Sequence, residues 1–127
     1  MKRKVIRSKV TAPWPFLSSA VEYGGVVYVS GVVPYELNTG KMKRGSIEEQ
    51  TKVCLRNLKE VLKSANSSLE LVLKIQVYCS NSGHYERFNK VYIEYFPKDP
   101  PARTFITVGS FGIDFDIEMD AIAALKE

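Results

Sequence analysis

An arginine stands at the start of a predicted strand, directly behind two stiff residues. Arg103 follows a Pro-Pro pair, and the β-type residues after it indicate a strand over 103–108. The nearest acid is Asp99, which lies beyond the prolines. A planar guanidinium can bind a small carboxylate through two parallel hydrogen bonds. The position therefore suggests an anion-binding arginine or one half of a surface ion pair.

Acidic residues alternate along the next predicted strand, 117–125. Because 103–108 precedes it closely, we expect the two strands to pair antiparallel, with Asp120 diagonal to Arg103. A carboxylate there would position or deprotonate a water beside a bound ligand. The alternative is a cross-strand ion pair, worth about 0–1 kcal/mol, which periodicity alone favours. By alternation, one strand face contains Asp116, Glu118, Asp120 and Ile122.

The thiols and the single histidine do not form a metal-binding pattern. Cys54 and Cys79 fall on the apolar faces of a predicted helix and a predicted strand, so we expect two reduced core residues. His84 has no ligand-like neighbour at helical spacing. We therefore expect no metal site.

Length and composition are typical of a folded globular chain. The 127 residues predict one domain over 1–127, with 45% apolar and 25% charged residues. The net charge of +4 comes from 18 basic and 14 acidic residues, which does not by itself favour a nucleic-acid partner.

Targeting signals are weak. No apolar run approaches the roughly 20 residues that span a bilayer, so no membrane association is expected. Five basic residues precede Glu22, the first acid. They fit a solvated first strand better than a vestigial mitochondrial presequence. The expected compartment is the cytoplasm, with the mitochondrial matrix as the alternative.

The strongest secondary-structure signal is a helix over 46–65. Ser46 and Glu49 form a capping-box pattern, an apolar stripe follows, and Asn66 is a suitable stop. Gly24-Gly25 between two β-type runs predicts a hairpin turn. A second helix is expected at 84–96, strands at 5–7, 20–23, 26–30, 71–79, 103–108 and 117–125, and loops at 12–16, 35–45 and 109–116. The resulting order, β-β-β-α-β-α-β-β, predicts an α+β fold.

Several segments together resemble the RidA/YjgF family of reactive-intermediate deaminases, from about residue 5 to residue 125. They are AVEYGGVVYVSGVVP, GSIEEQTKVCLRNLKEVLKSANSSLELVLKIQVY, FNKVYIEYF, PPARTFITV and IEMDAIAAL. The resemblance implies a chorismate-mutase-like fold, a mixed six-stranded sheet packed by two helices. It also implies a homotrimer whose clefts lie between subunits.

The implied activity is hydrolysis, without metal or cofactor, of 2-imino and 2-enamino acids to 2-keto acids and ammonia. Substrates of this class include 2-aminoacrylate, 2-iminopropanoate and 2-iminobutanoate, and their removal protects pyridoxal-phosphate enzymes. By position, Arg103 matches the arginine that holds the substrate carboxylate, assisted by the backbone N–H of Phe105. Asp120 takes the place of a glutamate that orients water. Residues implied to line the cleft are Leu17, Ser30, Gly31, Asn89 and Phe105.

The chain departs from the family pattern at several of these positions. Leu17 replaces a tyrosine, Phe105 a cysteine and Val32 a glutamine. Asp120 has one methylene less than glutamate, and a displacement near 1 Å can reduce a rate about a hundredfold. We therefore expect a smaller, more apolar and slower site.

Three functions remain open at this stage. The first is the deaminase. The second is a non-catalytic trimeric sensor or scaffold that binds a small carboxylic acid, which Leu17 and Phe105 favour. The third is RNA cleavage or translation inhibition, labels that the family has also carried. The sequence offers no RNA-binding motif and no histidine pair for it.

Overall fold

The computed structural model describes residues 2–11, 13–111 and 115–127. Parts of the predicted loops 12–16 and 109–116 lie outside this range. The described elements, in order, are β1 (Lys4–Ile6), β2 (Ala20–Tyr23), β3 (Val26–Val32), β4 (Tyr35–Glu36), β5 (Lys41–Met42), α1 (Ile47–Ser64), β6 (Val72–Cys79), α2 (Tyr85–Tyr95), β7 (Ala102–Thr107) and β8 (Ile117–Ala124), with 3-10 turns at Leu69–Leu71 and Ser82–His84. The α+β prediction is confirmed. The loop predicted at 35–45 contains the small β4–β5 hairpin.

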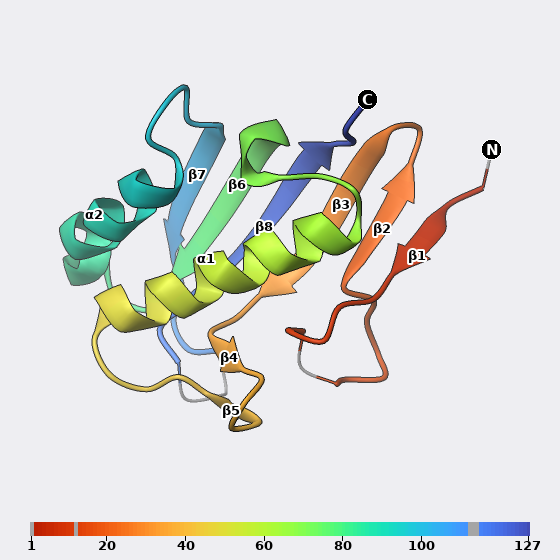
Figure 1. Cartoon of the computed structure of the whole chain (residues 1–127). Coiled ribbons are helices and arrows are strands. Elements are labelled where there is room, and N and C mark those ends of the chain that lie inside the picture. The colour runs from red at the N-terminus through yellow and green to blue at the C-terminus, as the bar shows by residue number, and fades with distance from the viewer. Residues whose placement is uncertain (1, 12, 112–114) are drawn as a thin grey trace.

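A mixed six-stranded sheet forms one layer and two helices form the other. The strand order is β1-β2-β3-β8-β6-β7. Figure 1 shows α1 crossing the sheet and α2 beside β7, both on the same side. Alternate residues of β6 and β8 are buried on that side and half-exposed on the other. We call these two surfaces the covered face and the open face.

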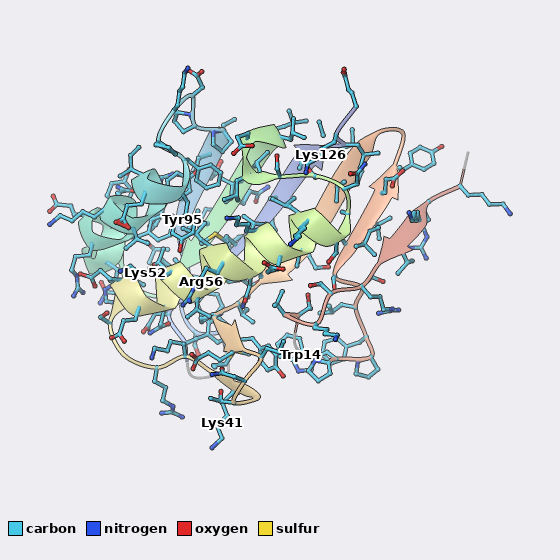
Figure 2. All side chains as sticks on the ribbon, in the orientation of Figure 1. Trp14, Lys41, Lys52, Arg56, Tyr95 and Lys126 are labelled. Carbon is cyan, nitrogen blue, oxygen red and sulfur yellow. The ribbon has the colours of Figure 1, made fainter. Side chains whose placement is uncertain are left out.

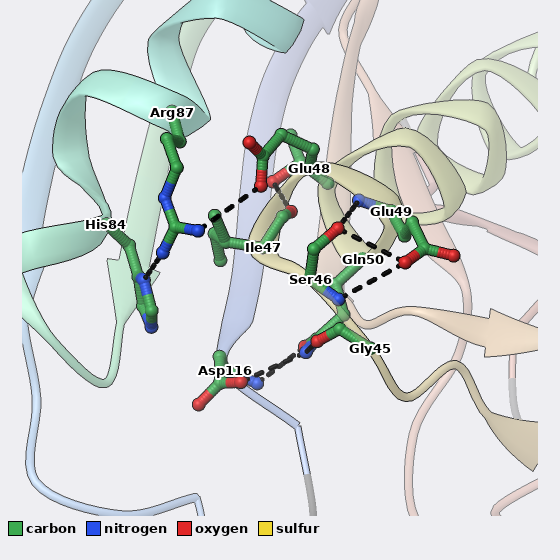
Figure 3. Close-up of polar contacts among 10 residues, drawn as sticks. Gly45, Ser46, Ile47, Glu48, Glu49, Gln50, His84, Arg87 and Asp116 are labelled. Atoms are coloured by element: carbon green, nitrogen blue, oxygen red, sulfur yellow. Dashed lines mark hydrogen bonds and ion pairs between the residues drawn. The ribbon is translucent and has the colours of Figure 1, made fainter.

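Helix α1 begins and ends as its sequence predicts. The Ser46 hydroxyl accepts a hydrogen bond from the Glu49 backbone N–H, and the Glu49 carboxylate accepts one from the Ser46 backbone N–H. Figure 3 shows this reciprocal pair. Asn66, just beyond the helix, has a φ of 58°, the left-handed conformation that asparagine tolerates. In Figure 2, Lys52 and Arg56 lie on the outer surface of α1.

The Gly24-Gly25 hairpin is also confirmed. Its φ angles are 62° and 81°, so both positions are left-handed. A two-residue turn of this kind matches the twist of its flanking strands, and glycine adopts it without a Cβ clash. The turn joins β2 to β3 with Tyr23 opposite Val26.

The structure corrects the predicted pairing of the last two strands. β7 is an edge strand parallel to β6, and β8 lies on the other side of β6. The predicted antiparallel pairing of β7 with β8 is therefore wrong. Arg103 is opposite Ile75 of β6, whereas Asp120 is opposite Gln76. Since successive residues of a strand point to opposite faces, Arg103 lies on the covered face and Asp120 on the open face.

The alternation of apolar residues in the predicted strand 71–79 places Leu73 on the inner face with Ile75, but the structure turns Leu73 outward. Val72 is 7% exposed and Leu73 is 52% exposed. The register against β8 shifts here, because β6 has one extra residue between its pairings with Ala123 and Ile122. Such a bulge interrupts the alternation of faces. Leu73 therefore points outward, whereas Ile75 is buried as predicted.

Helical spacing in the predicted helix 84–96 indicates an apolar stripe that includes Phe88, Tyr92 and Phe96, and these three side chains are buried. Phe88 and Tyr92 of α2 pack toward the sheet with Phe96, which follows the helix. Cys54 and Cys79 are buried free thiols. Burial raises the pKa of Cys54 well above its ordinary range, so this thiol is an unreactive core group.

Candidate functional site

Arg103 is held between β7 and α2 by neutral partners. Its Nη1 donates to Asn89 Oδ1 at 2.8 Å, and its Nη2 donates to the Tyr85 hydroxyl at 3.3 Å. The guanidinium carbon lies 4.8 Å from the centroid of the Tyr92 ring. Similar contacts at 5.7 to 5.8 Å involve Tyr85, Phe88 and Phe105. Aromatic rings attract a guanidinium without neutralising its charge.

Among the described residues, the charge of Arg103 has no counter-ion. No carboxylate of residues 2–11, 13–111 or 115–127 lies within ion-pair distance of its guanidinium. An arginine has five N–H donors, and the two protein acceptors leave donors free. The group can therefore bind an anion.

A backbone donor lies on the same edge strand. The Val108 N–H donates to the Cys79 carbonyl at 2.8 Å, toward β6. Because N–H groups alternate in direction along a strand, the Phe105 N–H points away from β6, to the open edge of the sheet. Arg103, Asn89, Tyr85 and the Phe105 N–H form what we call the arginine site.

A second cluster lies on the open face, around a shallow hollow of about 300 Å³. Its central residues are Gly31, Tyr78, Glu118 and Asp120, which we call the acid site. They come from three adjacent strands, β3, β6 and β8. The full lining of the hollow is Gly31, Tyr78, Val108, Ser110, Phe111, Glu118 and Asp120.

Gly31 and Glu118 approach each other closely. The pairing of β3 with β8 shifts by one residue between Val29 and Val32, so Gly31 belongs to a bulge. A Cβ at Gly31 would overlap the Glu118 carboxylate. Burial, and then the negative charge of Asp120, raise the pKa of Glu118. This carboxyl group is suited to proton transfer.

Asp120 is fixed by a tyrosine. The Tyr78 hydroxyl donates to Asp120 Oδ2 at 2.8 Å. This bond, reinforced by burial, raises the pKa of Tyr78 to about 12, so the phenol stays neutral and continues to donate. Asp120 therefore has a defined orientation beside Glu118.

Helix α1 positions the strands that form the acid site. Gln50 Nε2 donates to Asp116 Oδ2 at 3.0 Å, and the Asp116 N–H donates to Gln50 Oε1 at 2.8 Å. Figure 3 shows this double contact between α1 and the start of β8. Asn57 donates to the carbonyls of Val33 and Tyr35, just after the bulge. The core helix thus fixes both strands that bring Gly31 to Glu118.

Leu17 and Ser30 lie in a neighbouring hollow of about 460 Å³. The Ser30 hydroxyl donates to the Ser18 carbonyl at 2.6 Å, and Arg7 donates to the Leu17 carbonyl at 3.3 Å. Ser30 precedes Gly31 in the bulge, so this hollow adjoins the acid site. Leu17 contributes an apolar wall and no hydroxyl.

The predicted site residues thus fall into two groups. Arg103, Asn89 and Phe105 lie together as the family resemblance implied. Asp120 was expected to share a wall with Arg103, but the two lie on opposite faces of the sheet. The expectation failed because β6 lies between β7 and β8.

Sequence reasoning missed three contributors. Tyr85 and Tyr78 are contacts between elements, which periodicity cannot identify. The alternation in β8 places Glu118 on the same face as Asp120 but assigns it no role. Its pairing with Gly31 depends on the bulge in β3. The sequence signal that was available was the alternation of acids in β8.

The described residues contain neither a metal-binding cluster nor a membrane-spanning helix. No cluster of three or more His, Cys, Asp or Glu side chains is arranged to hold a metal ion. No described helix combines the length and apolar character needed to cross a membrane.

Comparisons with known proteins agree with this architecture. A family model described as Endoribonuclease L-PSP matches residues 8–125. A RutC family protein of Pyrococcus abyssi is 36% identical over 122 residues, which cover 96% of both chains. The mitochondrial protein MMF1 of Saccharomyces cerevisiae is 36% identical over 109 residues, covering 86% of this chain and 74% of the yeast protein.

Solved structures show the same fold. Yeast Mmf1 has a TM-score of 0.93 and 32% identity, covering 98% of this chain and 100% of its own. A Yersinia pestis protein, described as of unknown function and of the conserved Rid family, has a TM-score of 0.92, 28% identity and the same coverages. The chorismate-mutase-like fold expected from the sequence is confirmed, and the chain belongs to the RidA/YjgF family.

Proposed function

We propose that the protein hydrolyses reactive 2-imino acids and their 2-enamino tautomers to 2-keto acids and ammonia. The observation that carries this proposal is the unneutralised guanidinium of Arg103 at an open sheet edge, beside the outward N–H of Phe105. Two such donors match the two oxygens of a small carboxylate. The family membership supports the same ligand class.

The proposal requires a second copy of the chain. The arginine site and the acid site lie on opposite faces of one sheet, so they cannot contact the same small molecule within a protomer. The helices cover only one face, and the open face contains the exposed apolar side chains of Tyr28 and Ile106. An interface that set the β7 edge of one protomer against the open face of another would place Arg103 of the first near Glu118 of the second. We propose a homotrimer with three such clefts.

The chemistry requires little more than positioning. Arg103 and the Phe105 N–H hold the carboxylate, and Glu118 with Asp120 orients a water toward the imine carbon. Water attacks this carbon to give a carbinolamine, the C–N bond breaks with proton transfer to nitrogen, and a keto acid and ammonia leave. The imine carbon is already electrophilic, so orientation supplies most of the required acceleration. The raised pKa of Glu118 favours its role as the proton carrier.

Phe105 favours a second candidate, a small-carboxylate sensor or scaffold without turnover. Its ring packs edge-on against the Tyr85 ring, with the two centroids 4.9 Å apart. The centroid of the Phe88 ring lies 5.5 Å from that of Phe105. This packing narrows the space beside Arg103. Such a site would retain binding while excluding larger substrates.

RNA cleavage is the less favoured alternative, although the matching family model bears an endoribonuclease description. The chain contains one histidine, and His84 Nδ1 lies 3.0 Å from Arg87 Nη2. Figure 3 shows this contact at the start of α2. A single chain therefore offers no histidine pair for general acid–base cleavage of RNA.

The deciding experiment couples the protein to a pyridoxal-phosphate enzyme that releases 2-aminoacrylate. The proposal expects faster ammonia release with the wild type and little acceleration with Arg103→Lys. Equal rates with and without wild-type protein, while a keto acid still binds, would favour the sensor. An RNA incubation run in parallel should show no cleavage.

A further inference from the structure

Two tyrosines of α2 contact Arg103, but their hydroxyl groups differ. Tyr92 is only 5% exposed, and its hydroxyl is a buried group without a hydrogen-bond partner among the described residues. Burial raises its pKa to about 12. Tyr85 is 44% exposed, and its hydroxyl accepts a hydrogen bond from Arg103 Nη2. Only the Tyr85 hydroxyl combines contact with the guanidinium and access from solvent.

The proton of the Tyr85 hydroxyl remains available. A phenol has one proton to donate and can also accept. Since Arg103 donates to this oxygen, the phenol proton must point elsewhere. Within the described part of the chain, no acceptor takes it. An exposed donor beside a guanidinium is oriented for the same anion.

The Tyr85 ring is positioned independently of its hydroxyl. It packs against Phe105 at an interplanar angle of 88°, and the Arg103 guanidinium lies 5.7 Å from its centroid. Both contacts depend on the ring alone. A phenylalanine at this position would therefore keep the packing and remove only the donor.

We propose that Tyr85 is a further ligand-binding residue, which donates its hydroxyl proton to the carboxylate held by Arg103 and the Phe105 N–H. The ligand class is a 2-oxo or 2-imino monocarboxylate with a short apolar side chain, because the Tyr85 and Phe105 rings border the position of the anion. The role of Tyr85 in turnover rests on the proposed function, whereas its role in binding does not.

The test compares Tyr85→Phe with a matched control, Tyr92→Phe, in the full-length protein. Binding of 2-oxobutanoate is titrated by calorimetry or NMR, and kcat and KM are measured with the 2-aminoacrylate assay. Loss of a hydrogen bond to a charged group should raise the Kd of Tyr85→Phe about tenfold. Its KM should rise in parallel, while kcat changes less. Tyr92→Phe should bind like the wild type, because the Tyr92 hydroxyl is buried and the substitution retains the ring beside Arg103.

Each result separates the two proposals. An unchanged Kd in Tyr85→Phe, when Arg103→Lys loses binding, overturns the role of Tyr85 and leaves the deaminase intact. A tenfold weaker Kd without ammonia release by the wild type supports Tyr85 and refutes the deaminase. Equal weakening in Tyr85→Phe and Tyr92→Phe would indicate general disturbance of Arg103 and overturn the specific donor. Absence of 2-oxobutanoate binding by the wild type would also overturn it.

Discussion

The two faces of the six-stranded sheet differ in what covers them and in the charge they present. The covered face consists of apolar side chains such as Ile75, Val77 and Met119, with Arg103 near its edge. The open face presents Glu118 and Asp120. One sheet thus keeps its candidate anion-binding group and its candidate proton carriers apart. These groups therefore cannot neutralise each other within one chain, and a shared ligand would require the interface between protomers proposed above.

Substitution of Arg103 on the covered face or of Glu118 on the open face should produce the largest loss of activity. Arg103→Lys retains the charge but loses the planar fork, and we expect kcat/KM to fall about tenfold to a hundredfold. Glu118→Gln should reduce kcat by a comparable factor. Circular dichroism should show folded proteins in both cases. Normal hydrolysis with a large fall in Tm for Arg103→Lys would indicate a structural arginine.

Mixing the two defective proteins tests whether the faces meet between protomers. Random reassembly of Arg103→Ala with Glu118→Gln at equal amounts regenerates native clefts in about a quarter of positions. We therefore expect the mixture to regain activity clearly above the residual activity of either protein alone. No recovery after verified exchange of subunits would contradict a shared cleft. Sedimentation of a stable monomer at micromolar concentration would contradict the trimer itself.

Gly31→Ala should disturb only the open face. The added Cβ would overlap the Glu118 carboxylate, which must rotate away. Because small displacements of a reacting group are costly, we expect kcat to fall about tenfold. Binding of 2-oxobutanoate through Arg103 should change less. Gly83→Ala, in an exposed turn, is a useful matched control. Equal effects in both variants would argue against the specific contact.

The pH dependence of stability should separate two neighbouring acids of β8. The pKa of Glu118 is raised in the folded protein, so its stabilising contribution is present below its ordinary value of 4.5. That contribution is lost as pH rises through the raised pKa. Hydrogen bonds from Ser80 and Gln50 lower the pKa of Asp116, so its contribution is present above 3.8 and is lost at lower pH.

Urea titrations across this range provide the measurement. Relative to Glu118→Gln, the wild type should become less stable as pH rises from about 4.5. Relative to Asp116→Asn, the wild type should become less stable as pH falls below about 4. Parallel curves for all three proteins would show that neither group is linked to folding.

The smallest effect is expected at the α1 cap, on the covered side. Ser46→Ala removes the bond to the Glu49 N–H and should lower the free energy of unfolding by about 1 kcal/mol. Since the cap is not part of either site, kcat/KM should remain within about twofold of the wild-type value. A large loss of activity would show that the acid site depends on the end of α1, through Gln50.

Much of the local structure followed from the sequence. The capping box and apolar stripe of α1, the Gly24-Gly25 turn and the alternating faces of β8 are set by contacts between near neighbours. The segments that resemble the family also identified it. The resemblance implied that Arg103, Asn89 and Phe105 belong to one site, and the structure shows them in one cluster.

Tertiary structure alone decided which elements lie side by side. Two strands close in sequence were expected to pair, but β6 inserts between β7 and β8, and this places Arg103 and Asp120 on opposite faces. The bulges that turn Leu73 outward and bring Gly31 to Glu118 likewise depend on pairing with β8. Period and propensity describe each strand by itself, whereas its neighbours are chosen by burial of the whole sheet against two helices.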